Sequence, residues 1–109
     1  MTINRFNPSR DGNEKEIVKA FKSLGISVER LNTPLDLLLG WNKRNYLVEV
    51  KMPTKKLNAN QVKFTEGWKG QFFICYSVDD ALRFGKGIKS IKNKDIYNES
   101  EAIEKTNLF

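Results

Sequence analysis

The sequence predicts a small mixed α/β domain in which a four-stranded sheet is flanked by helices. Two observations predict it: apolar residues recur at helical spacing in three segments, and they alternate or run together in four shorter ones. The segments follow the order helix, three strands, helix, strand, helix, which is typical of a mixed α/β domain. The 109 residues have room for one domain, residues 1–109, with a core from about residue 10 to 85 and a polar extension, 86–109.

The first helix is expected in the segment RDGNEKEIVKAFKSLG, residues 10–25. Asp11 or Asn13 can cap its N-terminus, and Gly25 ends it. Its buried stripe is expected to contain Ile17, Val18, Phe21 and Leu24.

Two acidic residues in this helix are expected to face opposite ways. At about 100° per residue, Glu14 falls on the inward side of the helix and Glu16 points away from it. An inward carboxylate at a helix start either complements the positive helix end or belongs to a site. The helix alone slightly favours the first explanation.

The remaining elements follow from alternation and from turn residues. Strands are expected at 26–31, 35–41, 45–51 and 71–77, with a turn at 42–45 and a short helix within 58–68. Ser77 is expected to cap a last helix at 78–85. The polar extension has room for a short strand at 88–91 and a helix near 99–105.

The second and third strands place three ionisable residues together. If DLLLGW and YLVEVK form a hairpin around NKRN, Trp41 lies opposite Tyr46, and Asp36 lies opposite Lys51. Glu49 shares the face of Lys51 and is diagonal to Asp36, about 7 Å away. One divalent ion could bridge two carboxylates at that separation.

Two carboxylates this close repel each other unless a cation lies between them. Lys51 supplies part of that charge, and Mg²⁺ or Mn²⁺ could supply the rest and activate water against a phosphodiester. The competing explanation is that Glu49 and Lys51 form part of a solvated strand face, which is the commoner role of such a pair. With Asp36 included, the two explanations are close to even.

Composition excludes several other chemistries. The chain has no histidine and one cysteine, so it cannot by itself form a Cys/His zinc site or a Ser-His-Asp triad. Cys75, in the apolar run QFFICYS, is expected to pack as a small hydrophobe. No run is apolar enough for a membrane span or a signal peptide, which predicts a cytoplasmic protein without a membrane partner.

The sequence also resembles the PD-(D/E)XK nuclease superfamily. The resemblance rests on LDLLLG followed by YLVEVK, with further likeness in NEKEIV, LNANQVKF and WKGQFFICYSVDDAL. It runs from about Arg10 to Leu82 and is closest to small Holliday-junction resolvases and VRR-type nucleases of phage and prophage. In this sequence Leu35 separates Pro34 from Asp36, where the family usually has proline directly before the aspartate.

The resemblance implies a restriction-endonuclease-like fold and a Mg²⁺- or Mn²⁺-dependent DNA endonuclease. Its metal ligands would be Asp36, Glu49 and the main-chain carbonyl of Val50, and Lys51 would be the catalytic lysine. Glu14 would match the helix carboxylate of the family, and Gln61 a glutamine near the active site. From the residues alone, Gln61 is equally well explained as an exposed helix glutamine.

DNA is the expected partner, because the net charge of +6 and the pI near 9.5 favour an anionic one. The residues that could hold phosphates are Lys55 and Lys56 after the core strand, Lys43 and Arg44 in the turn, and lysines 86, 89, 92 and 94. Lys55 and Lys56 are favoured because they follow the site directly, and each of the others is more often a solvated side chain. Trp41 and Trp68 can stack on bases, although packing explains both better. A junction substrate would require a homodimer. The alternative function is a non-catalytic nucleic-acid-binding or phage regulatory protein on the same fold.

Overall fold

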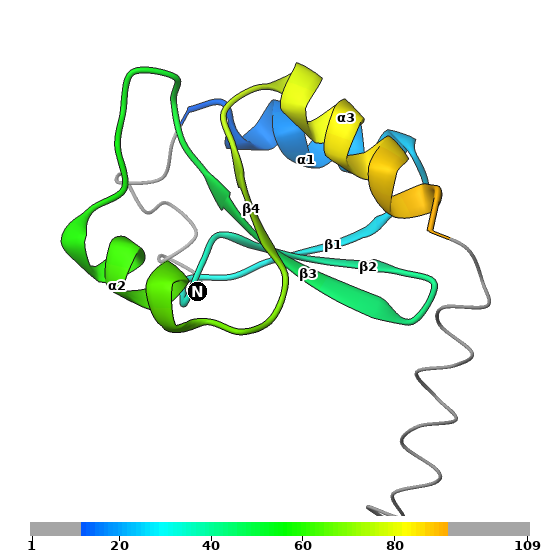
Figure 1. Ribbon diagram of the computed structural model, residues 1–109. Helices are drawn as coiled ribbons and strands as arrows, with labels where there is room; N and C mark the ends of the chain where they lie inside the picture. Colours follow the sequence, from blue (N-terminus) through cyan, green and yellow to red (C-terminus); the bar gives the residue numbers. More distant parts are fainter. Residues whose placement is uncertain (1–11, 92–109) are drawn as a thin grey trace, which may run out of the picture.

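The computed structural model describes residues 12–91, which form one four-stranded sheet and three helices (Figure 1). The elements are α1 (Glu14–Ser23), β1 (Ser27–Arg30), β2 (Leu37–Trp41), β3 (Arg44–Val50), α2 (Ala59–Gly67), β4 (Phe72–Cys75) and α3 (Val78–Lys89). This order confirms the predicted mixed α/β class and the predicted sequence of helices and strands. None of the helices in this part of the chain is long and apolar enough to span a bilayer.

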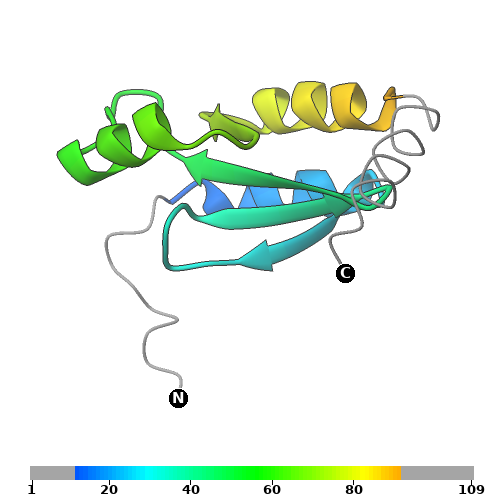
Figure 2. The same cartoon turned by 60° about the horizontal axis from the view of Figure 1, so that its bottom comes forward.

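The strands lie in the order β1-β2-β3-β4. Pairing is antiparallel from β1 to β3 and parallel between β3 and β4. A parallel neighbour requires a crossover connection, and α2 lies within that crossover. Helices α1 and α3 lie side by side over one face of the sheet, whereas α2 is set apart from them (Figures 1 and 2).

The core lies between the sheet and the α1–α3 layer. Alternate residues of the central strands face it, so that Leu39 lies opposite Tyr46 and Leu37 opposite Val48. The members of this buried cluster are Ile17, Val18, Ala20, Phe21, Ile26, Leu37, Leu39, Tyr46, Val48, Val50, Cys75, Ala81 and Ile88. The intervening residues of β2 and β3 therefore face the other side of the sheet.

The predicted hairpin is present, but its predicted register is wrong by two residues. Trp41 pairs with Arg44 rather than with Tyr46. The turn contains two residues instead of four, because Asn42 and Lys43 both adopt left-handed backbone conformations, with φ of 50° and 64°. A two-residue turn with positive φ at both positions matches the twist of the paired strands. Continuing this register sets Asp36 opposite Glu49 and not opposite Lys51.

The last helix is longer than expected. Ser77 caps it, as predicted, by accepting a hydrogen bond from the Asp80 amide. The helix then continues past Gly85 to Lys89, so the strand expected at 88–91 is wrong. Gly85 permits close packing against α1, because a Cβ at this position would lie 2.5 Å from Leu24 Cδ1. Ile88 is buried in the core on the same helix. The helix expected near 99–105 lies outside the described residues.

The backbone of the hairpin turn gives a first prediction. Lys43→Gly should raise the free energy of unfolding by about 0.5–1 kcal/mol, because glycine adopts positive φ without the steric cost that lysine has. Urea unfolding followed by circular dichroism measures the change. Gly25→Ala is the reverse test and should lower the free energy of unfolding. Gly25 has φ of +83°, and the nearest atom to a new Cβ would be 3.7 Å away, so the loss would come from backbone strain and not from a steric clash. Destabilisation by Lys43→Gly would contradict the proposed turn.

The buried thiol gives a second prediction. Burial raises the pKa of Cys75 from 9.0 to about 11, and a hydrogen bond with the Ser77 backbone opposes this shift only weakly. Thiol labelling at pH 8 should therefore be at least about 100-fold slower than in unfolded protein. A Cys75→Ala, Lys63→Cys variant, with its cysteine on the exposed side of α2, is the control and should react rapidly.

The same pKa shift sets the pH dependence of stability. Between about pH 9 and pH 11 the unfolded thiol is ionised while the folded one keeps its proton, so the free energy of unfolding falls as pH rises through this window. Cys75→Ala should flatten this part of the curve. Rapid labelling of the folded parent at pH 8 would show that the thiol is accessible.

Candidate active site

The start of α1 lies against the ends of the two parallel strands. Asn13 Nδ2 donates hydrogen bonds to the main-chain oxygens of Lys51, at 3.2 Å, and Tyr76, at 3.0 Å. Asn13 is the N-cap residue, as one of the two predicted alternatives had it, but its side chain makes no capping hydrogen bond. The side chain instead fixes the first turn of α1 beside the carboxyl ends of β3 and β4.

The carboxylate of Glu49 is removed from water. The residue is 2% exposed, on the strand face opposite to the core cluster. Its Oε2 lies 3.7 Å from the Lys51 amine and accepts a 2.6 Å hydrogen bond from Gln61 Nε2. The solvated-face explanation is therefore wrong for Glu49, and Gln61 is half-buried against it.

Helix α2 holds Gln61 in place through a capping box. Asn58 Oδ1 accepts from the Gln61 amide, and Gln61 Oε1 accepts from the Asn58 amide, both at 2.9 Å. Because Oε1 is used by the cap, Nε2 faces Glu49. The Gln61 side chain therefore both caps the N-terminus of α2 and hydrogen-bonds the buried carboxylate of Glu49.

Asp36 joins this region from the neighbouring strand. It is half-buried just before β2, and its Oδ2 accepts a 2.8 Å hydrogen bond from the Val50 amide. Its main-chain oxygen accepts from the Leu31 amide, which extends the β1–β2 pairing. The structure therefore brings Asp36 to the backbone next to Glu49, although by a different register from the predicted one.

Glu14 is buried on the inward side of α1, as predicted, whereas Glu16 is exposed. Glu14 Oε2 lies 3.2 Å from Nε of Arg30 at the end of β1. Sequence reasoning missed Arg30 and the cross-strand role of Asn13. The only signal for Arg30 is its place at the end of an alternating segment, and a partner on another element cannot be identified from that.

The cations predicted to hold phosphates lie at different places. Lys55 and Lys56 are exposed in the loop between β3 and α2, next to Glu49 and Lys51 in the chain. Lys43 and Arg44 lie at the opposite end of β3, about 17–20 Å along the strand from Glu49 at the usual rise per residue. The Lys89 amine bonds the Leu24 main-chain oxygen at 2.7 Å and lies 4.9 Å above the Trp41 ring, so it joins α3 to the end of α1. Lysines 92 and 94 lie outside the described residues.

The side chains at the end of β3 suit a hard divalent cation. Over residues 12–91, no group of three or more Asp, Glu, His or Cys side chains is close enough to hold a metal ion. An ion at this place would therefore depend on Asp36, Glu49, the Val50 carbonyl and water. Two carboxylates with oxygen donors and retained water are the usual surroundings of Mg²⁺.

Comparison of this chain with protein-family models, curated proteins and solved structures finds no match. The geometry at the end of β3 is therefore what bears on function.

The contact between Gln61 and Glu49 gives a third prediction. Gln61→Glu keeps an acceptor for the Asn58 amide but turns the other oxygen towards Glu49. The free energy of unfolding at pH 7 should fall by about 1–3 kcal/mol, because two carboxylates then share a buried site. The loss should shrink as pH falls, since one of the pair gains a proton and the repulsion ends.

Asn60→Glu is the matched control, since it adds the same charge on the exposed side of the first turn of α2. Its stability should equal that of the parent or slightly exceed it. Urea unfolding of both variants between pH 4 and pH 8 makes the comparison. A pH-independent loss in Gln61→Glu would show that the new carboxylate does not meet Glu49.

Proposed function

We propose that this protein is a metal-dependent DNA endonuclease that hydrolyses phosphodiester bonds, with the site at the carboxyl end of β3. The observation that carries the proposal is the buried carboxylate of Glu49, bound to Lys51 and Gln61 beside Asp36. Removing a carboxylate from water costs several kcal/mol, and an ion pair recovers that cost only in part. A buried carboxylate at this place is explained if the site binds a metal cation and a phosphate.

Each residue has a role that its position supports. Asp36 and Glu49, with the Val50 carbonyl, would hold Mg²⁺ or Mn²⁺, which when bound neutralises phosphate charge and lowers the pKa of water. The Lys51 side chain is only 11% exposed, so its charge is poorly screened and can stabilise negative charge that develops on the phosphate. Gln61 orients Glu49. In the reaction, water adds to phosphorus and the bond to one ester oxygen breaks.

Two further features support DNA as the substrate. The net charge of +6 favours an anionic partner, and the exposed Lys55 and Lys56 follow the site directly in the chain. The resemblance of LDLLLG and YLVEVK to the PD-(D/E)XK superfamily, and to its junction-resolving members, agrees with the same substrate and with a structure-specific activity. A homodimer is expected only if four-way junctions are cut.

The second candidate is a non-catalytic nucleic-acid-binding or regulatory protein on the same fold. The observation that favours it is that Glu49 and Lys51 already neutralise each other at 3.7 Å. In that function the pair would be structural, and DNA binding would depend on surface lysines alone.

Cleavage of a labelled panel tests the proposal and is the fourth prediction. The panel contains a four-way junction, a flap, a duplex and a single strand, each with Mg²⁺, Mn²⁺ or EDTA. We expect cutting that requires the metal and that Asp36→Asn and Lys51→Met each reduce by about 100-fold or more, with DNA binding retained. Folding of every variant is checked by circular dichroism.

Matched controls come from α1, where Lys19 and Glu16 form an exposed pair. Glu16→Gln and Lys19→Met should cut at the parental rate, whereas Glu14→Gln should cut more slowly. Parental cutting by Asp36→Asn, or cutting in EDTA, would refute the proposed site. A folded parent that binds DNA and cuts nothing would favour the non-catalytic function.

A further inference from the structure

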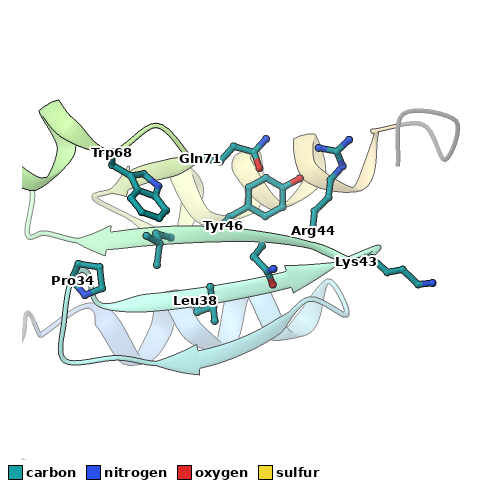
Figure 3. Close-up of a pocket in the computed structure, with 10 residues that line it drawn as sticks. Pro34, Leu38, Lys43, Arg44, Tyr46, Trp68 and Gln71 are labelled. Carbon is teal, nitrogen blue, oxygen red and sulfur yellow. The ribbon is translucent and has the colours of Figure 1, made fainter. Parts of the chain in front are cut away.

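An open pocket of about 780 Å³ runs along β3 on the way from the hairpin turn to α2 (Figure 3). This volume lies in the range of pockets that hold small ligands. Pro34 and Trp68 lie at the end near α2, and Lys43 and Arg44 lie at the turn end. Leu38 and Leu47, which are paired across β2 and β3, lie between them.

The pocket has an aromatic wall that is fixed in place but accessible. Trp68 stacks on Phe64 with ring centroids 5.3 Å apart, yet remains 43% exposed. Gly70 makes room for the indole, because a Cβ there would lie 2.7–2.9 Å from three of its atoms. An exposed tryptophan held between two neighbours loses little freedom when a flat ring binds against it.

The charge of the pocket suits an anion. Two of the described residues that line it are cationic and none is acidic, and Asn45 and Gln71 add amide groups. Apolar and aromatic surface at one end, with cations at the other, matches a nucleotide, whose base is flat and whose phosphate is charged.

The pocket and the candidate active site are neighbours on the same face of the sheet. Leu47 and Glu49 are two residues apart on β3, so they share a face at a spacing of about 7 Å. On the neighbouring strand, Leu38 and Asp36 have the same spacing, and the hairpin register sets Leu38 opposite Leu47. A strand of DNA with a base in the pocket would therefore have its backbone close to Glu49.

We infer that this pocket binds an unpaired base of single-stranded DNA and that the substrate of the proposed endonuclease contains a single-stranded segment. A base within a duplex is stacked and paired, so it cannot enter the pocket without being extruded. Trp68 contacts the base, and Lys43 and Arg44 contact flanking phosphates. The assignment of DNA as the ligand rests on the proposed function, whereas the existence and lining of the pocket are independent of it.

Tryptophan fluorescence tests this inference and is the fifth prediction. The chain has two tryptophans, so Trp41→Phe leaves Trp68 as the only indole. In EDTA, where no cutting occurs, an oligothymidylate of about 12 nucleotides should quench Trp68, and an abasic strand of equal length should not. The single strand should bind at least about tenfold more tightly than a duplex of the same length.

Substitutions then separate the parts of the pocket. Trp68→Ala should weaken single-strand binding about 5- to 100-fold. Gly70→Ala keeps the indole but displaces it, so it should weaken binding in the same direction. Lys43→Ala with Arg44→Ala should make binding less dependent on salt. Trp41→Phe alone, which changes a side chain packed against the core, should retain parental affinity.

Each other outcome contradicts a named part of the inference. Equal affinity for single strand and duplex, or binding unaffected by Trp68→Ala, refutes the base pocket. Stronger binding of an oligouridylate than of the oligothymidylate refutes DNA as the ligand. Cleavage without quenching refutes the pocket and leaves the endonuclease, whereas quenching by a folded protein that never cuts refutes the endonuclease and leaves the pocket.

Discussion

The carboxylate of Glu49, withdrawn from water at the end of a central strand, is the constraint on which the surrounding structure depends. A buried charge is tolerated only where cations and hydrogen-bond donors replace the lost water. Lys51 provides the charge and Gln61 the hydrogen bond. Gln61 can do so only because the capping box with Asn58 fixes its amide, so the position of α2 depends on the same contact that satisfies the carboxylate.

The parallel pairing of β3 and β4 explains why α2 lies there. A parallel strand can be reached only by a crossover, and the crossover from Val50 to Phe72 contains α2, whose Gln61 contacts Glu49 on the strand face opposite to the core cluster. The nine residues of α2 reach the end of β3 near Glu49, and the pocket lies further along the strand. It extends from Trp68 to the hairpin turn.

Most of the fold could be predicted from the sequence, because apolar alternation and capping residues are local signals. Ser77, Gly25 and the inward direction of Glu14 are examples. The hairpin register could not, since a lysine with positive φ is rare enough that NKRN is more naturally assigned a longer turn. Strand alternation predicts that Glu49 and Lys51 share a face, and the resemblance adds Gln61. Their burial and the Asn13 and Arg30 contacts arise from tertiary packing that no local pattern records.

Successive side chains of β3 point to opposite faces of the sheet, so that one set stabilises the core and the other set forms the candidate site. Val48 and Val50 face the core, while Leu47 and Glu49 face the pocket and the candidate site; Tyr46 belongs to the core cluster and also borders the pocket. A slip of one residue would exchange the two sets and place a carboxylate in the core, at a cost that the fold could not sustain. The turn at Asn42 and Lys43 fixes that register about 20 Å from Glu49. The backbone of the turn therefore determines which side chains reach the site, although it contacts none of them.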